Sequence, residues 1–337
     1  MSSSAGIRIG VIVPCRNEAR VIARRLANLG QSRFSADFAS PQLVVVDDDS
    51  VDETSALAVA SCEEMRGWTA EVITNVHAKG KNGAVKTGLD HFGEGVDVVI
   101  LTDADVLTGV DALSAIADAF SKEEALGMAT GVQRIHESLP AQPCELNDGD
   151  AMGLYDRWTR GVRRYESRRG RLFSVHGQLL AWRAGLGLAP GSLAADDLEM
   201  MLELRSNHPS RKVRMVEGAV FYEERSPARD DQDLRRARAY MQALPRMRAS
   251  GIGAQAWFYS RVPVLAPFLA GMCVLLVSLS LILLGGRDAF ILFVAALALS
   301  TLHPAVRRFF GLLLIIERAR RAERSERLSA SWETARA

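Results

Sequence analysis

The sequence has few cysteines and none at short spacing. Its 337 residues include 4 cysteines, which are widely separated and never form a CxxC pair. Disulfide-rich domains and structural zinc sites both depend on closely spaced cysteines. The pattern therefore argues against both classes, and it suits a reducing compartment.

An excess of charge of one sign is also missing. The chain carries 41 Lys and Arg against 40 Asp and Glu, so its net charge is +1. Proteins that bind nucleic acid usually carry a clear basic excess. We therefore expect no nucleic-acid partner.

Recognised leader and phosphate-binding signatures are absent from the sequence. The apolar run near the N-terminus meets Pro14 and then charged residues, so it lacks the length and cleavage site of a signal peptide. The sequence contains no GxGxxG after this run and no GxxxxGK[ST] anywhere. A dinucleotide-binding or P-loop protein is correspondingly disfavoured, and the run is better read as a first strand.

Apolar runs rich in Val and Ile alternate with amphipathic segments between residues 7 and 135. Such alternation predicts an α/β fold with a parallel sheet and crossover helices. The predicted strands are 7–13, 43–46, 71–74, 96–102 and 127–133. The predicted helices between them are 18–29, 52–65, 82–92 and 109–121. Further on, we expect helices near 150–167, 195–207 and 230–250 and a strand at 212–224.

The last fifth of the chain has long uncharged stretches. No residue between Arg261 and Arg287 is charged, and as a helix this run would span roughly 37 Å against a hydrocarbon core of about 30 Å. A second uncharged run covers 289–306. The pair predicts a transmembrane hairpin, with a buried helical hairpin of a soluble core as the alternative.

The charge around these runs predicts their orientation. Arginines gather on both flanks, at Arg246, Arg248, Arg261, Arg307, Arg308, Arg318, Arg320 and Arg321. The positive-inside rule then places both flanks in the cytoplasm, at the cell's inner membrane. We expect a cytoplasmic catalytic domain over 1–245, a basic interfacial segment over 246–261, two transmembrane helices over 262–316 and a basic tail over 317–337.

Polar clusters follow four of the predicted strands. They read PCRNEA, DDDSVDET, NVHAKGKNGAVKTG and TDADV. Carboxyl ends of parallel strands line one crevice, where ligands of such sheets bind. Each cluster alone could be a turn or a solvated loop, but four at one edge indicate a binding site.

The last cluster places Asp103 and Asp105 directly after a buried strand. Carboxylates at the edge of a core need a cation, a helix N-terminus or solvent to compensate them. Carboxylate oxygens suit Mg²⁺ or Mn²⁺, and Mg²⁺ usually shares its carboxylates with substrate phosphates. Lys79 and Lys81, near a helix start, suit anionic oxygens. Together they favour a metal–nucleotide diphosphate.

Seven motifs in order resemble the family 2 glycosyltransferases of the GT-A fold, over about residues 7–245. They read VIVPCRNEA, VVVDDDSVDET, KGKNGA, LTDADV, HGQLLAWRAG, ADDLE and QDLRR. The resemblance implies a GT-A-type nucleotide-binding sheet and an inverting transfer of sugar from a nucleotide-diphosphate sugar, dependent on Mg²⁺ or Mn²⁺. A membrane-associated lipid would be the acceptor.

The resemblance also implies roles for individual residues. Asp48 would bind the nucleotide base, and Lys81 and Asp103 would also contact the nucleotide. Asp105 would bind the metal together with Asp103. Asp197 would be the catalytic base, although an aspartate that only favours the N-terminus of its helix is the alternative reading. Further nucleotide contacts would come from Pro14, Arg16 and Glu18.

Some positions depart from the family pattern or remain open. QDLRR stands where processive members carry QxxRW, so Arg236 replaces the tryptophan and addition of a single sugar is favoured. Gln232, Arg235, Arg236 and His176 could contact a phosphate or the acceptor, and His176 could equally be structural.

The identity of the acceptor stays open between two chemistries. A base at Asp197 favours a lipid hydroxyl, whereas a polyprenyl phosphate is already ionised and needs no base. A nucleotidyltransferase and a catalytically inactive membrane scaffold with the same fold are the competing functions.

Overall fold

The computed structural model describes residues 6–34, 40–140, 154–224, 229–250, 252–300 and 304–325. The chain divides into two compact units, the first comprising 1–227 and 329–337 and the second 228–328. The expected functional boundaries at 245, 261 and 316 stay predictions.

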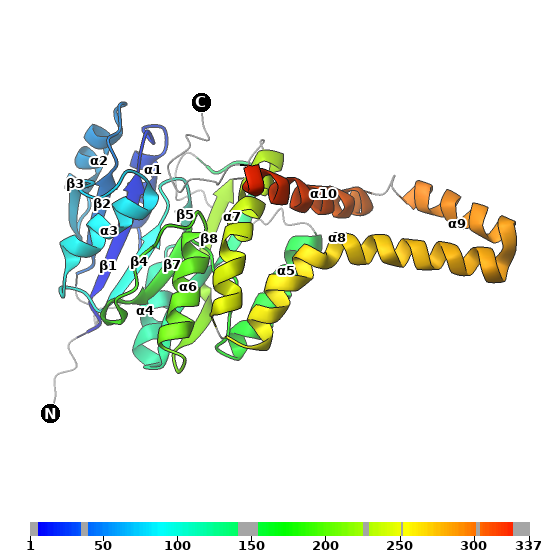
Figure 1. Ribbon diagram of the computed structural model, residues 1–337. Helices are drawn as coiled ribbons and strands as arrows, with labels where there is room; N and C mark the ends of the chain where they lie inside the picture. The colour runs from blue at the N-terminus through cyan, green and yellow to red at the C-terminus, as the bar shows by residue number, and fades with distance from the viewer. Residues whose placement is uncertain are drawn as a thin grey trace. The chain divides into compact units, whose positions relative to one another are not determined.

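The described residues of the first unit form an eight-stranded sheet in the order β3-β2-β1-β4-β7-β6-β8-β5 (Figure 1). Its strands are β1 (Ile9–Cys15), β2 (Gln42–Asp47), β3 (Thr69–Thr74), β4 (Val98–Thr102), β5 (Leu107–Thr108), β6 (Leu126–His136), β7 (Leu179–Arg183) and β8 (Lys212–Glu224). Its helices are α1 (Ile22–Gly30), α2 (Thr54–Glu63), α3 (Lys81–Phe92), α4 (Ala112–Lys122), α5 (Leu154–Arg168), the short η2 (Ala184–Leu186) and α6 (Asp196–Asn207).

The predicted parallel sheet is confirmed for its first four strands. β1 pairs in parallel with β2 and with β4, and β2 pairs in parallel with β3. The sheet as a whole is mixed, because β7 lies between β4 and β6 and is antiparallel to both. The sequence left β7 unassigned, since its short apolar run has no helix beside it to mark a crossover.

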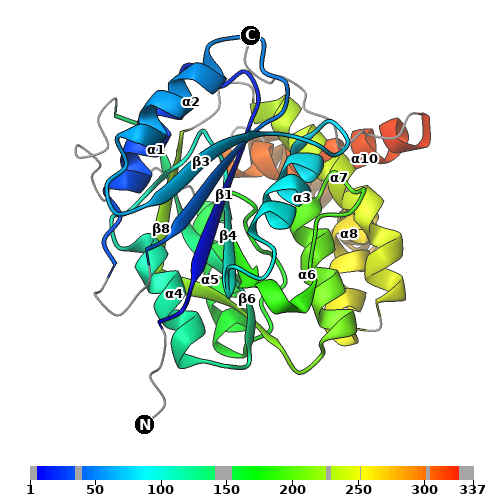
Figure 2. The same cartoon turned by 90° about the vertical axis from the view of Figure 1, so that its left-hand side faces the viewer.

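The central strand β1 presents alternate residues to two layers of helices, on either side of the strands in Figure 2. Ile9, Val11 and Val13 belong to the core that includes the buried residues of α1 and α4. Gly10 faces α3 on the other side, where a Cβ at this position would lie 2.7 Å from the ring of Phe92. Because successive side chains of a strand point to opposite faces, helices pack on both faces of the sheet. The ends of the strands are then its accessible edge.

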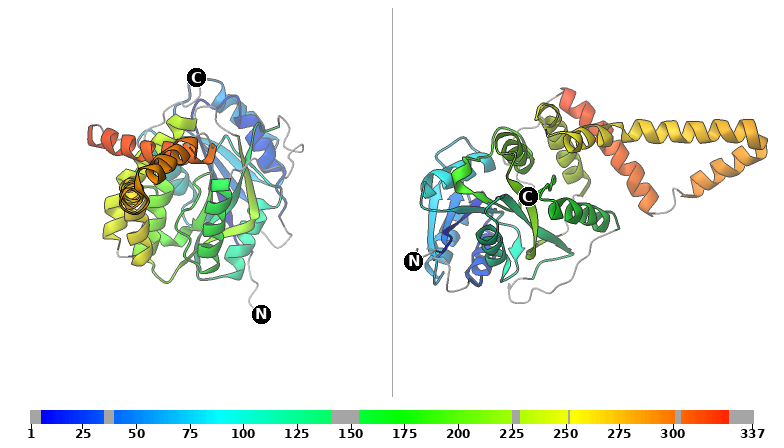
Figure 3. Two further views of the ribbon diagram at one scale, coloured as in Figure 1. Left: turned by 90° about the vertical axis from the view of Figure 1, so that its right-hand side faces the viewer. Right: turned by 90° about the horizontal axis from the view of Figure 1, so that it is seen from below.

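The second unit is helical. Its elements are α7 (Arg229–Ala249), α8 (Ala254–Ser280), η3 (Leu281–Gly285), α9 (Gly286–Ser300) and α10 (Pro304–Ser325). α7 packs against α8 and α10, and Glu323 of α10 accepts hydrogen bonds from Arg238 (2.8 Å) and Gln242 (3.1 Å) of α7. Figure 3 shows α8 and α9 as two helices joined through η3.

The expected transmembrane hairpin is not supported. Within the described parts of the chain, we find no helix that combines the length and the apolar character needed to cross a membrane. Within the second uncharged run, the structure describes α9 over Gly286–Ser300 and then α10 from Pro304.

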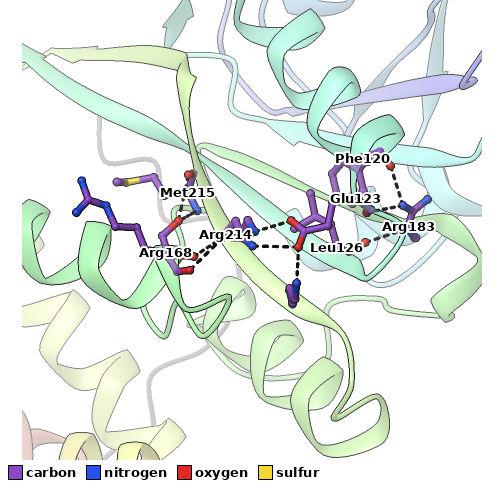
Figure 4. A network of polar contacts seen from close by, with 9 residues as sticks. Phe120, Glu123, Leu126, Arg168, Arg183, Arg214 and Met215 are labelled. Carbon is purple, nitrogen blue, oxygen red and sulfur yellow. Dashed lines mark hydrogen bonds and ion pairs between the residues drawn. The ribbon is translucent and has the colours of Figure 1, made fainter.

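An ion-pair network at Glu123 joins α4 to β7 and β8 (Figure 4). The Glu123 carboxylate accepts hydrogen bonds from Arg214 Nε (2.5 Å) and Lys212 Nζ (2.7 Å). Arg183 donates to the backbone oxygens of Phe120, Glu123 and Leu126. The bond from Arg214, followed by that from Lys212, lowers the pKa of Glu123 to about 2.

We predict that Glu123→Gln lowers the free energy of unfolding by about 1–2 kcal/mol at pH 7, since the charge-assisted bonds are lost. The depressed pKa means that this contribution is present above the ordinary pKa of glutamate and is lost as the pH falls toward 2. Urea unfolding at several pH values measures it. The exposed neighbour Glu124 is the control, and an equal effect of Glu124→Gln would contradict the assignment.

Candidate active site

The adjacent strands β3, β2, β1 and β4 end at one edge of the sheet. Because they are parallel, the residues that follow them meet there: Asn75, Asp48, Arg16 and Asp103. The strand-end clusters therefore meet at one edge of the sheet, as the sequence predicts. Pro14 is buried within β1 beside Val46 of β2.

Asp48 is a buried carboxylate that follows β2 and contacts residues of the loops after β1 and β3. It is 1% exposed, and its two oxygens accept hydrogen bonds from Asn75 Nδ2 (2.6 Å) and Gly80 N (2.8 Å). A guanidinium nitrogen of Arg16 lies 3.7 Å from Asp48 Oδ2. The carboxylate therefore fixes the loops after β1 and β3 relative to β2.

The loops after β1 and β2 are tied to each other. Asn17 and Asp49 adopt left-handed backbone conformations, with φ of 54° and 56°, which these short polar side chains tolerate. Asn17 Oδ1 accepts a hydrogen bond from Val51 N (2.9 Å), and Glu18 N donates to Thr54 Oγ1 (2.7 Å). These bonds hold the backbone of Glu18 at the strand ends, and its contact with a nucleotide stays a prediction.

Lys81 begins α3 and carries the positive charge of the site. Its Nζ lies 2.6 Å from Asp103 Oδ1. Burial alone would lower the pKa of Lys81, but the charges of Asp103, Asp196 and Asp197 outweigh burial and raise it. Lys81 is therefore a firmly protonated ammonium group among carboxylates.

Negative charge exceeds positive charge around Asp103. Burial, together with the charges of Asp105 and Asp196, raises the pKa of Asp103 to about 6 in spite of the nearby Lys81. Asp196 Oδ2 is buried and has no hydrogen-bond partner among the described residues. A further cation would offset this surplus of carboxylate charge.

The residues at this edge fit a divalent ion that shares its ligands with a substrate. In the described ranges, no three His, Cys, Asp or Glu side chains are grouped so as to hold a metal by themselves. Mg²⁺ is commonly held by one or two carboxylates together with phosphate oxygens. Asp103 and Asp105 supply two such carboxylates beside an unpartnered carboxylate oxygen of Asp196, so the donor set suits Mg²⁺ or Mn²⁺.

Asp197 lies in the first turn of α6. Its Oδ2 accepts a hydrogen bond from Gly177 N (3.1 Å) and its Oδ1 accepts one from Leu198 N (2.7 Å). Burial and the charge of Asp196 raise the pKa of Asp197 to about 6, opposed by the Leu198 N–H and by Lys81. Asp197 is thus both a helix-start residue and a fixed carboxylate with a pKa suited to proton transfer near neutral pH.

His176 is held in place by its neighbours. Its ring packs edge-on against Phe221, its backbone N donates to Thr130 Oγ1 (3.0 Å), and its Nε2 contacts the guanidinium of Arg163. These contacts are compatible with a structural role for His176, and both that role and its contact with a phosphate stay predictions. The pair also brings the Arg163 charge close to Gly177.

The remaining predicted contacts lie in the second unit. Gln232, Arg235 and Arg236 all belong to α7. Their roles toward a phosphate or an acceptor stay predictions.

Sequence reasoning missed three polar residues that support the site. Asn75 bonds to Asp48, Asn82 donates to the backbone oxygens of Gly191 (3.1 Å) and Leu193 (3.3 Å) ahead of α6, and Arg25 is buried beneath β4. Asn75 and Asn82 stand within the strand-end cluster after β3, so position could have flagged them. A buried arginine on an amphipathic helix gives no such signal.

Comparison with known proteins supports the resemblance to family 2 glycosyltransferases. Residues 10–169 match the model of the family described as Glycosyl transferase family 2. The resemblance to family 2 glycosyltransferases is confirmed. Over 105 residues, or 30% of this chain, the sequence is 32% identical to dolichyl-phosphate beta-glucosyltransferase of Mus musculus and 31% identical to that of Homo sapiens. The matched segment spans 32% of the length of each of these relatives.

Two solved structures of glycosyltransferases share the fold. A mannosyltransferase from Pyrobaculum calidifontis, in complex with GDP-Man and Mn²⁺, has a TM-score of 0.69 at 20% identity, over 95% of this chain and 87% of that one. Glucosyl-3-phosphoglycerate synthase from Mycobacterium tuberculosis, with Mn²⁺, UDP and its product, has a TM-score of 0.50 at 18% identity, over 72% and 80% of the two chains. The α/β GT-A-like architecture is thereby shown.

We predict that Asp48→Asn weakens the binding of UDP or GDP at least tenfold, because the amide nitrogen cannot accept the bonds that orient the loops after β1 and β3. Isothermal titration calorimetry with purified protein measures the change. Asp49→Asn is the matched control, since the Asp49 carboxylate is exposed and pairs with Lys79 at the surface (2.8 Å). Equal losses in both variants would remove Asp48 from the nucleotide site.

Proposed function

We propose that this chain is an inverting glycosyltransferase that moves one sugar from a nucleotide-diphosphate sugar to a hydroxyl group of a membrane-associated lipid. The observation that carries the proposal is the position of Asp197. Its carboxylate is fixed by two backbone N–H groups and lies within the electrostatic influence of Lys81, which pairs with Asp103. A base thus lies beside a site suited to a metal and a diphosphate.

The donor would lie along the ends of β1 to β4. Asp48, with Arg16 beside it, would receive the nucleoside, and Lys81 would bind diphosphate oxygens. Asp103 and Asp105 would hold Mg²⁺ or Mn²⁺. When bound, the divalent ion supplies charge neutralisation for the departing diphosphate. The complexes of the two structural neighbours with Mn²⁺ support this arrangement.

Asp197 would perform the proton transfer. Its carboxylate would take the proton of the acceptor hydroxyl as the acceptor oxygen bonds to the anomeric carbon. The bond from that carbon to the diphosphate breaks on the opposite face, which inverts the anomeric centre. Lys81 would stay protonated throughout and would stabilise the negative charge of the leaving group.

A lipid acceptor is supported by the surface of the second unit. α8, η3 and α9 expose many large apolar side chains, and patches of this kind mark contacts with proteins or membranes. They are Leu265, Leu269, Met272, Leu275, Leu276, Val277, Leu279, Ile282, Leu283, Ile291, Leu292 and Val294. We place this surface against the cytoplasmic leaflet of the inner membrane, where the arginines of α7 and α10 meet anionic lipid.

A lipid phosphate is the second candidate acceptor. The names of the curated relatives, which are dolichyl-phosphate glucosyltransferases, favour it. The guanidinium of Arg163, which contacts His176 next to Gly177, adds a positive charge suited to a phosphate. An ionised phosphate needs no general base, so the two acceptors differ in their dependence on Asp197. An inactive scaffold is disfavoured, because Asp105 and Asp197 are both present.

We predict that one of UDP-, GDP- or dTDP-sugars binds in the presence of Mn²⁺ or Mg²⁺. Asp105→Ala should lose this metal-dependent binding, because one metal ligand is removed. Asp197→Asn should keep it and lose turnover at least a hundredfold on a hydroxyl acceptor, in line with the usual contribution of a general base. Calorimetry measures binding, and release of nucleoside diphosphate in the presence of lipid extracts measures turnover.

The outcomes separate the candidates. Retained turnover in Asp197→Asn, with a polyprenyl phosphate as the only acceptor used, would replace the hydroxyl acceptor by the phosphate. Absence of binding for every nucleotide sugar with either metal would overturn the glycosyltransferase proposal and favour the scaffold.

We predict that the turnover number falls tenfold per pH unit below about pH 6. The pKa of Asp197 is raised to about 6, so the carboxylate accepts protons above that pH and is already protonated below it. A pH–rate profile with saturating donor measures this limb. A profile that stays flat down to pH 5 would show that Asp197 does not act as the base.

A further inference from the structure

The loop that carries Asp103 and Asp105 is short and is held at both ends. It spans residues 103–106, between the end of β4 at Thr102 and the start of β5 at Leu107. A tight turn at Ala104 and Asp105 joins the two strands. Its geometry depends on what holds the two strand ends.

Arg25 of α1 bonds to both ends of this loop. Its NH2 donates to Thr102 Oγ1 at 2.6 Å, and its NH1 lies 3.3 Å from Thr108 Oγ1. The same NH1 donates to Asn28 Oδ1 at 2.6 Å. One guanidinium group therefore bridges the residue before Asp103 and a residue of β5.

Asn28, one turn further along α1, also bonds to β5. Its Oδ1 accepts a hydrogen bond from Thr108 N at 2.8 Å, and its Nδ2 donates to Thr108 O at 2.9 Å. The side-chain amide of Asn28 thus bonds to the backbone N–H and C=O of Thr108, as a further strand would, while β5 pairs with β8. Asn28 is itself oriented by its bond to Arg25.

The charge of Arg25 is fully buried without an ion pair. The side chain is 0% exposed, and no carboxylate of the described residues lies within ion-pair distance. Its Nε has no hydrogen-bond partner there either. Burial lowers the pKa of Arg25 to about 9, whereas the charges of Asp103 and Asp105 oppose the change. An unpaired buried charge is costly, so it persists only where something compensates it, and these two carboxylates do so.

The same network reaches the element that holds Asp197. Thr102 Oγ1, which accepts from Arg25, donates in turn to Gln178 O at 2.9 Å. Gln178 follows Gly177, whose N–H donates to Asp197 Oδ2. Through Thr102, Arg25 is thus linked both to the loop of Asp103 and Asp105 and to the segment that bonds to Asp197.

We propose that Arg25 is a positioning residue that fixes the 103–106 loop for divalent-metal binding, by clamping Thr102 and Thr108 from inside the core. The inference rests on the proposed function, because it requires the loop to bind a metal with a nucleoside diphosphate. Groups that orient metal ligands from behind typically change metal affinity by about 10–100-fold when they are replaced.

The test is the affinity for Mn²⁺ in the presence of UDP and, separately, GDP, measured from the free Mn²⁺ signal by electron paramagnetic resonance. Arg25→Lys keeps the charge but cannot span both threonines. We expect its Mn²⁺ dissociation constant to rise at least tenfold, while the affinity for the nucleotide without metal stays unchanged. A purely structural role would lower the melting temperature and leave the Mn²⁺ affinity of the folded protein as it is.

Two further variants keep the test decisive. Thr108→Val removes the hydroxyl that Arg25 reaches and that also donates to Asn28 Oδ1 (3.1 Å). It should raise the Mn²⁺ dissociation constant about threefold, and it decides the question if Arg25→Lys does not fold. Arg24→Lys is the matched control, because the neighbouring Arg24 donates to the backbone oxygens of Leu139 and Pro140 and, among the described contacts, to neither Thr102 nor Thr108. We expect it to bind Mn²⁺ like the wild type.

The failures of the two proposals are distinguishable. If the wild type binds Mn²⁺ with neither nucleotide, the proposed function fails and the inference fails with it. If the wild type binds Mn²⁺ and both Arg25→Lys and Thr108→Val bind it equally well, the inference alone is overturned. A comparable loss in Arg24→Lys would also overturn it, since the effect would then be general to α1.

Discussion

The Lys81 ammonium group holds together a cluster of acidic side chains at the open edge of the sheet. It pairs with Asp103 at 2.6 Å and feels the charges of Asp196 and Asp197. Burial raises the pKa of Asp103 to about 6, and the charges of Asp105 and Asp196 add to this effect in spite of Lys81. Further positive charge would therefore be favourable at this edge, and in the proposed function a divalent ion bound with the donor's diphosphate would supply it.

The surrounding structure keeps this unbalanced cluster in place. Parallel pairing of β1 with β2 and β4 brings the loops to one edge, and Asp48 ties two of them together through Gly80 and Asn75. Inside the core, Arg25 lies behind the carboxylates that the metal would use. Packing of the sheet supplies the free energy that is needed to hold like charges close together.

The sequence predicted the parts of the fold that follow from hydrophobic period and strand-end chemistry. The first four strands, their crossover helices and the gathering of the strand-end clusters at one edge were all readable, because each rests on local pattern. β7 was not, since its place between β4 and β6 is decided by tertiary pairing. The transmembrane prediction rested on run length alone and finds no support among the described helices. Arg25 escaped notice because burial of a charge depends on partners distant in sequence.

The most direct test of the account is a crystal structure of the protein with Mn²⁺ and a nucleoside diphosphate, with data collected at a wavelength where manganese scatters anomalously. The account predicts one anomalous peak in contact with Asp103 or Asp105 and with phosphate oxygens, and the nucleoside beside Asp48. A nucleotide bound elsewhere, or a manganese ion away from both aspartates, would contradict the claim that the ends of β1 to β4 form the donor site.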